Sequence, residues 1–149
     1  MKSVSYFRRF FLSLFLILAA QSASALDACP VDDKEFLHQI TSSADWVDVH
    51  AVFKRNFPAC QDEGLYADGY SNLVVGVMAN NWGDLHVLDE LAAKDDAFKA
   101  FVLRHVATSA GDEDLRRVLR SAQRDCPASS LGLCKEIARR CKLALGGKR

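Results

Sequence analysis

Apolar residues along most of this chain recur every three or four positions, which is the spacing of one face of an α-helix. No stretch of useful length alternates between apolar and polar residues, as a half-buried strand would. We therefore expect an all-α fold of about seven helices arranged in antiparallel helix pairs. The predicted helices follow Asp32, Asp45, Asp62, the Asn80-Asn81 break, Asp95 or Asp96, Gly111, and Ser129 or Ser130, which are capping or helix-breaking positions.

The longest predicted helix runs from about Asp62 to Ala79 and contains several glycines. Glycine weakens a helix by up to about 1 kcal/mol relative to alanine. Gly69 and Gly76 lie seven residues apart, so they share a face of this helix. Their spacing predicts that a neighbouring helix packs closely there.

A short pattern of Trp-x-Asp-aliphatic-His occurs twice, at Trp46 and at Trp82, and a weaker copy starts at Asp114. The two tryptophans lie 36 residues apart, and repeat periods of about this length are typical of helix-pair solenoids. In the spacing of its predicted helix pairs the chain resembles short HEAT-like or tetratricopeptide-like arrays, although it carries the signature of neither family. The pattern thus favours a short αα array, with a chance similarity of five positions as the alternative.

The first 25 residues show a different pattern, in which three basic residues precede an apolar run over residues 10–20. Ala23-Ser24-Ala25 then supplies the small residues that a signal peptidase recognises. A membrane-spanning helix needs roughly twenty apolar residues, so this run is too short to span. We expect cleavage of a secretory signal peptide at 1–25, which leaves a single all-helical domain at 26–149 in a bacterial periplasm or the medium.

A lipid anchor at Cys29 is the competing interpretation of this region, because Leu26-Asp27-Ala28-Cys29 superficially resembles a lipobox. Asp27 stands where such motifs carry a small or apolar residue. The apolar run also ends well before Cys29. Export without a lipid anchor is therefore the prediction.

The five cysteines of the exported chain predict disulfides, which an oxidising compartment permits. Cys134 and Cys141 lie about 10.5 Å apart along one predicted helix, too far for a bond that needs its Cα atoms within roughly 7 Å. We expect disulfides Cys29–Cys60 and Cys126–Cys134, with Cys141 as a buried free thiol. The alternative joins Cys126 to Cys141 and leaves Cys134 free.

Catalytic and metal-binding motifs are absent from the sequence. It has no Cys-x-x-Cys or His-x-x-x-His spacing for a metal, no calcium loop and no Gly-x-Ser-x-Gly turn for a nucleophile. We predict a protein that is not an enzyme and that holds no metal or cofactor.

His50 and His86 occupy matching positions of the short pattern, each two residues after an aspartate. Residues two apart on a helix point about 200° away from each other, so neither histidine forms a ready-made dyad with that aspartate. If the repeats stack, both histidines line one groove. An enzyme that acts on cell-wall material through groove Asp and His residues is therefore an alternative function. His105, by contrast, shares an apolar helix face and is expected in the core.

Charge is distributed unevenly along the exported chain, which has 16 basic and 19 acidic residues. The segment 26–115 carries a net charge of −11 and the segment 116–149 a net charge of +8. Such polarity can steer a charged partner, or the two ends can attract each other within one fold. The predicted contact surfaces are an acidic region at 84–96 and a basic helix face. The acidic candidates are Asp84, Asp89, Glu90, Asp95 and Asp96, and the basic ones are Arg116, Arg117, Arg120 and Arg124.

These features predict an exported, non-catalytic module that binds another protein. By class and compartment it resembles an immunity or inhibitor protein against a toxin that acts in the periplasm. No Phe, Tyr or Trp follows Phe101, so the basic segment lacks aromatic residues for base stacking, and we expect no nucleic-acid partner. Contact of the basic face with an anionic envelope surface is a further alternative.

Overall fold

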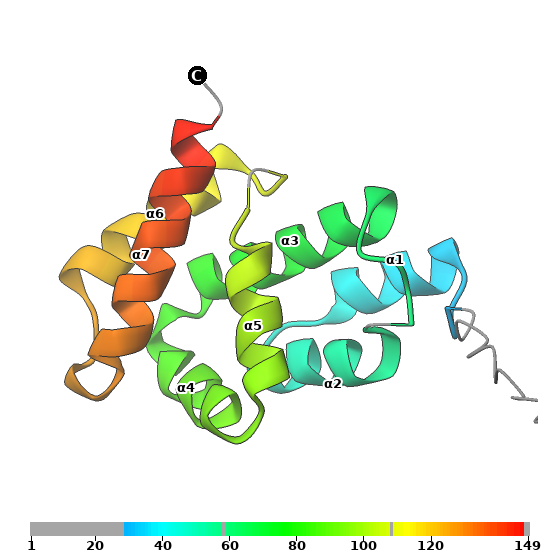
Figure 1. Cartoon of the computed structure of the whole chain (residues 1–149), viewed down its shortest axis with the longest axis horizontal. Helices are drawn as coiled ribbons and strands as arrows, with labels where there is room; N and C mark the ends of the chain where they lie inside the picture. Colours follow the sequence, from blue (N-terminus) through cyan, green and yellow to red (C-terminus); the bar gives the residue numbers. More distant parts are fainter. Residues whose placement is uncertain (1–28, 58, 108, 148–149) are drawn as a thin grey trace, which may run out of the picture.

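The computed structural model describes residues 29–57, 59–107 and 109–147 (Figure 1). Within these ranges the fold is all-helical and contains no strand, as the periodicity predicts. The predicted signal peptide and its cleavage site lie outside the described residues. The elements are α1 (Asp33–Ser42), α2 (Trp46–Asn56), α3 (Gly64–Asn80), the 3-10 helix η1 (Trp82–Asp84), α4 (Leu85–Lys94), α5 (Asp96–His105), α6 (Asp112–Arg124), the 3-10 helix η2 (Ala128–Ser130) and α7 (Leu131–Gly146).

Aspartate side chains begin three of the helices at the predicted positions. Asp32 accepts a hydrogen bond from the backbone N–H of Glu35 at 2.8 Å. Asp45 accepts two such bonds at 2.9 Å, and Asp95 accepts one from the N–H of Phe98 at 3.0 Å. Each bond satisfies a backbone N–H that has no acceptor within the first turn of its helix.

Helix α3 begins two residues later than predicted, at Gly64 instead of Asp62. Gly64 has a φ of 54°, a left-handed conformation that glycine adopts without steric cost. The backbone therefore turns into the helix at this glycine. Asp62 stays outside α3, where its carboxylate forms an ion pair with Arg104 and lies 3.4 Å from His105 Nε2.

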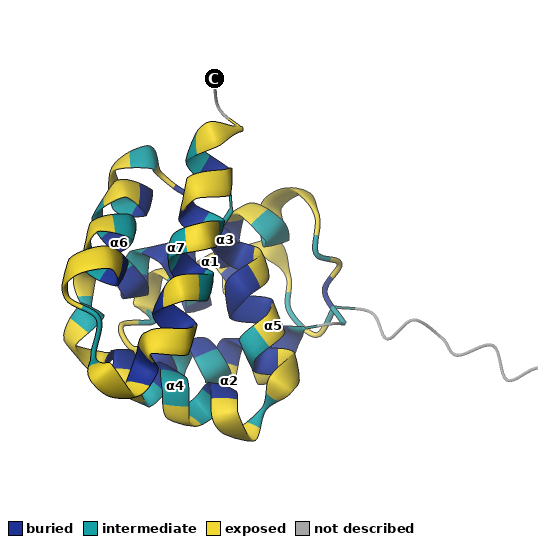
Figure 2. Ribbon diagram, turned by 60° about the vertical axis from the view of Figure 1, so that its left-hand side comes forward, coloured by how far each residue is buried: buried dark blue, intermediate teal, exposed yellow. Residues whose placement is uncertain are grey.

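Helix α3 is central to the core and contacts α1, α2, α5 and α6 (Figure 1). Its sequence is apolar on several faces because neighbouring helices cover it on several sides. Aromatic rings fill the space between α1, α2, α3 and α5, and Figure 2 shows the buried residues of the helices turned inward. The rings in mutual contact are those of Phe36, Phe53, Phe57, Tyr70, Phe98 and Phe101.

The two tryptophans of the predicted repeat have unlike surroundings. Trp46 opens α2 and is only 1% exposed. Trp82 lies half-buried in η1, and its Nε1 donates a hydrogen bond to the carbonyl of Asp125 at 3.0 Å. The structure thus confirms an all-α fold with seven helices in the described residues, whereas the repeat, its antiparallel pairing and the likeness to HEAT or tetratricopeptide arrays stay predictions.

The fold contains two disulfides, and both match the predicted pairings. Cys29 bonds to Cys60, which ties the segment before α1 to the loop after α2. Cys126 bonds to Cys134, which ties the loop after α6 to α7. Cys141 is free and buried, so the alternative Cys126–Cys141 pairing is not formed. In the described ranges we find no helix with the length and apolar character that crossing a membrane requires.

Candidate functional site

The predicted acidic region at 84–96 spans η1, α4 and the start of α5, and two of its five carboxylates are engaged inside the fold. Asp95 caps α5 and also lies 3.4 Å from His50 Nε2 and 3.5 Å from Lys54 Nζ. The Phe98 N–H bond and these partners lower the pKa of Asp95. Asp89 accepts a hydrogen bond from Ser130 Oγ at 2.8 Å. The side chains that remain exposed are those of Asp84, Glu90 and Asp96.

His50 and His86 lie in different environments, although the repeat predicted equivalent ones. The half-buried ring of His50 packs against Phe98, with centroids 4.7 Å apart, and bonds to Asp95. His86 is exposed and lines a pocket of about 300 Å³ between α4 and η2. The other residues that line this pocket are Asp89, Glu90, Ala93 and Ser129.

The predicted basic face of α6 is partly neutralised by the acidic first turn of its own helix. Arg116 pairs with Asp112 at 3.3 Å. Arg117 pairs with Asp114 at 3.4 Å and donates a hydrogen bond to Asn80 Oδ1 at 3.0 Å. Arg120 and Arg124 are exposed, and neither forms an ion pair with another described residue. The free positive charge of this face therefore lies at the carboxyl end of α6.

A groove between α6 and α7 adds a second set of cations that the predicted contact surfaces leave out. It has a volume of about 510 Å³, and the two helices lie side by side in Figure 1. Lys135, Arg139 and Lys142 of α7 line one wall, and Gln123 of α6 lines the other. Ala122, Cys134 and Ala138 complete the lining. We call this set of seven residues the basic groove.

The spacing of the three α7 cations can be read from the sequence, although the predicted contact surfaces do not include these residues. Residues separated by four and then three positions occupy one face of a helix. All three of these side chains are exposed, and Figure 2 shows exposed residues along the outer sides of α6 and α7. That α6 supplies the opposite wall is a consequence of tertiary packing.

A serine, a histidine and an aspartate meet in the interior, next to α3 and α5. Ser71 Oγ lies 3.3 Å from His105 Nδ1, and His105 Nε2 lies 3.4 Å from Asp62 Oδ1. This order of groups resembles the catalytic triad of serine hydrolases. Sequence reasoning placed His105 in the core, which is confirmed, but it missed both partners because they lie far from His105 in the sequence.

Four observations indicate that this cluster is structural. Ser71 is only 2% exposed, and its hydroxyl already donates a hydrogen bond to the carbonyl of Ala67 at 2.8 Å. A catalytic histidine takes the serine proton through Nε2 and bonds to the aspartate through Nδ1, whereas His105 presents the opposite nitrogens. Burial lowers the pKa of His105 to about 4, which makes it a weak base at neutral pH. The cluster therefore stabilises the contact between α3, α5 and the loop before α3.

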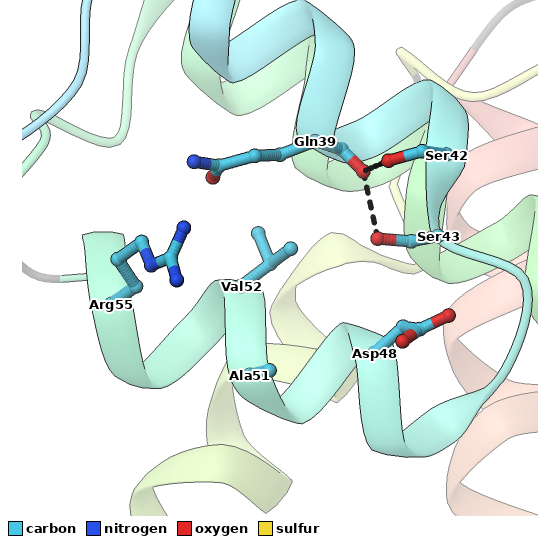
Figure 3. A pocket seen from close by; sticks show the side chains of 7 residues that line it. All are labelled: Gln39, Ser42, Ser43, Asp48, Ala51, Val52 and Arg55. Carbon is cyan, nitrogen blue, oxygen red and sulfur yellow. Dashed lines mark hydrogen bonds between the residues drawn. The ribbon is translucent and has the colours of Figure 1, made fainter.

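A small pocket of about 140 Å³ lies between α1 and α2 (Figure 3). Two of the residues that line it, Ser42 and Ser43, donate hydrogen bonds to the backbone carbonyl of Gln39 at 3.2 and 2.7 Å. The side-chain oxygen of Gln39 accepts a further bond from Asn56 at 2.8 Å. The bond between Gln39 and Asn56 joins α1 to α2, and we assign the pocket a structural role.

Metal ligation has no candidate among the described residues, because no three His, Cys, Asp or Glu side chains in them are grouped to hold an ion. The basic groove and the pocket beside His86 both present exposed charged side chains, and we treat them as the candidate sites. Searches for similar proteins found no family model, no curated protein and no solved structure that matches this chain.

Proposed function

We propose that the protein is an exported, non-catalytic module that binds another protein. The observation that carries this proposal is the basic groove, where three exposed cations line a concave surface between two packed helices. A cation on a convex surface is well solvated and needs no partner, whereas several cations along one groove favour an extended ligand of opposite charge.

Export is the second part of the proposal, and the two disulfides support an oxidising compartment such as the periplasm. In that compartment, small binding proteins that neutralise toxins are one class with these properties. We extend the proposal to an immunity or inhibitor protein that covers the active site of a toxin acting in the periplasm.

The experiment that tests this function is a pull-down of the tagged mature protein from the periplasm of its own host. We expect one protein to co-purify in stoichiometric amount at moderate salt, and mass spectrometry then identifies it. If that partner is a toxin, the purified protein should inhibit it at equimolar ratio. A monomer that retains no protein under these conditions would contradict the proposal.

A second candidate function is an enzyme of the cell wall, favoured by the pocket in which exposed His86 lies beside Asp89 and Glu90. Because His86 is exposed, His86→Ala should leave the melting temperature unchanged and abolish any hydrolysis of purified cell-wall material. Hydrolysis by the wild type that this variant lacks would favour the enzyme over the binding module.

A further inference from the structure

We infer that the basic groove is the docking site for an acidic segment of the partner protein. This inference rests on the proposed function and names the surface and the chemistry that binding uses. The carboxylate side chains of the acidic segment would pair with Lys135, Arg139 and Lys142.

The positive charge of the groove is not cancelled from within α7. Glu136 is the only acidic residue of this helix, and it pairs with Lys99 of α5 at 3.2 Å. On α6, which forms the opposite wall, Arg120 precedes Gln123 by three positions and therefore shares its face of the helix. Arg120 does not line the groove, but it is exposed and adds a cation to the same side of α6.

Exposed apolar groups accompany these cations. Leu131 lies four residues before Lys135 on the same face of α7 and is 52% exposed, and Leu143 is 60% exposed. Ala122 and Ala138 add small apolar groups to the groove lining. A protein segment that carries both acidic and apolar side chains matches this combination, whereas an inorganic anion would leave the leucines in water.

A membrane surface matches the same face less well. Helices that lie in the membrane interface bury a broad apolar face, often with Trp or Phe. The apolar face of α7 packs instead into the protein core, and α6 and α7 contain no aromatic residue. The two exposed leucines are separated by the cations and do not form a continuous apolar face.

The test uses a fluorescent peptide of alternating glutamate pairs and leucines, titrated into the mature protein. The groove variant is Lys135→Glu with Lys142→Glu, and the matched control is Lys34→Glu with Lys94→Glu. All four lysines are exposed, so both variants change the net charge equally. We expect about tenfold weaker binding in the groove variant, because two attractive pairs become repulsive, and little change in the control. The amide resonances of Ala122 and Ala138 should shift as the peptide binds the wild type.

Three outcomes would overturn the inference. Equal weakening in both variants would mean that net charge alone attracts the peptide. Binding to phosphatidylglycerol vesicles that needs the groove lysines, without binding to the peptide, would assign the groove to lipid. Amide shifts confined to other helices would place the peptide elsewhere. If the groove variant does not fold, Lys135→Gln with Lys142→Gln is the replacement, with a smaller expected loss of binding.

The pull-down allows the groove inference and the proposed function to be tested separately. A partner retained equally by the wild type and the groove variant would keep the protein-binding function and overturn the groove as its site. Failure to find any partner would contradict the proposed function, while the peptide titration would still decide whether the groove binds an acidic segment.

Discussion

Gly69 of α3 lies directly against the ring of Phe36 in α1, which leaves no room for a side chain at position 69. A Cβ atom there would stand 2.5 Å from Phe36 Cε1 and 2.9 Å from Ile40 Cδ1. Phe36 is fully buried, so its ring has little freedom to move aside. Gly76, on the same helix, has no such neighbour within 4 Å. Only one of the two glycines that predicted a close helix contact makes one.

Substitution of these two glycines by alanine should affect stability differently. Gly69→Ala should destabilise the fold by about 1–3 kcal/mol, because the added methyl group overpacks the α1–α3 contact. Gly76→Ala should be neutral or stabilise by up to about 1 kcal/mol, because alanine is the better helix former and has open space there. Urea unfolding of both variants measures the difference. Equal effects at the two positions would contradict the packing described for Gly69.

The buried His105 should make stability fall in mild acid. Its pKa is lowered from 6.5 to about 4, chiefly by burial, against the opposing charge of Asp62. Below pH 6.5, His105 therefore binds a proton in the unfolded chain, whereas in the folded chain it stays neutral until about pH 4. The free energy of unfolding should therefore be highest above pH 6.5 and should fall by up to about 3 kcal/mol between pH 6.5 and 4.

The matched variants for this prediction are His105→Gln and His38→Gln. His105→Gln should flatten the dependence of unfolding free energy on pH between 6.5 and 4, whereas His38→Gln should follow the wild type, because His38 is exposed. Denaturant unfolding at several pH values measures both. A pH dependence that His105→Gln leaves unchanged would show that other groups cause it.

Cys141 should be inert in the folded protein. The thiol is buried in α7, and burial raises its pKa to about 12, so almost no thiolate forms at neutral pH. Ellman's reagent should find no reactive thiol in the native protein and one per chain after unfolding without reductant. Three thiols in the unfolded protein would mean that one of the two disulfides does not form.

The two disulfides should contribute unequally to stability. Cys29–Cys60 spans a sequence separation of 31 residues and Cys126–Cys134 one of only 8. In the chain-entropy account the longer loop restricts the unfolded state more, by about 4 against about 3 kcal/mol. Paired alanine variants compared by urea unfolding measure this difference. A larger loss on removing Cys126–Cys134 would point to strain or packing effects beyond loop entropy.

The capping residues show which helix starts could be predicted from local sequence and which side-chain bonds could not. Asp32, Asp45 and Asp95 begin their helices as expected, because a cap is formed with backbone groups two or three residues away. Ser130 precedes α7 as predicted, yet its hydroxyl donates to Asp89 of α4 instead of accepting from the first turn. A distant carboxylate thus replaced the local bond that the sequence suggested.

By itself, the sequence predicted the helical class, most helix starts and the burial of His105, and it favoured the two disulfide pairings that the structure contains. The helices depend on periodicity and capping residues, which are local, and the spacing of Cys134 and Cys141 along one helix excluded a bond between them. Only the tertiary structure decided that His50 bonds to Asp95, that Ser71 and Asp62 flank His105, and that α6 and α7 enclose the basic groove. Those contacts join residues on separate helices, and the packing of the helices around α3, which no local pattern encodes, sets which side chains meet.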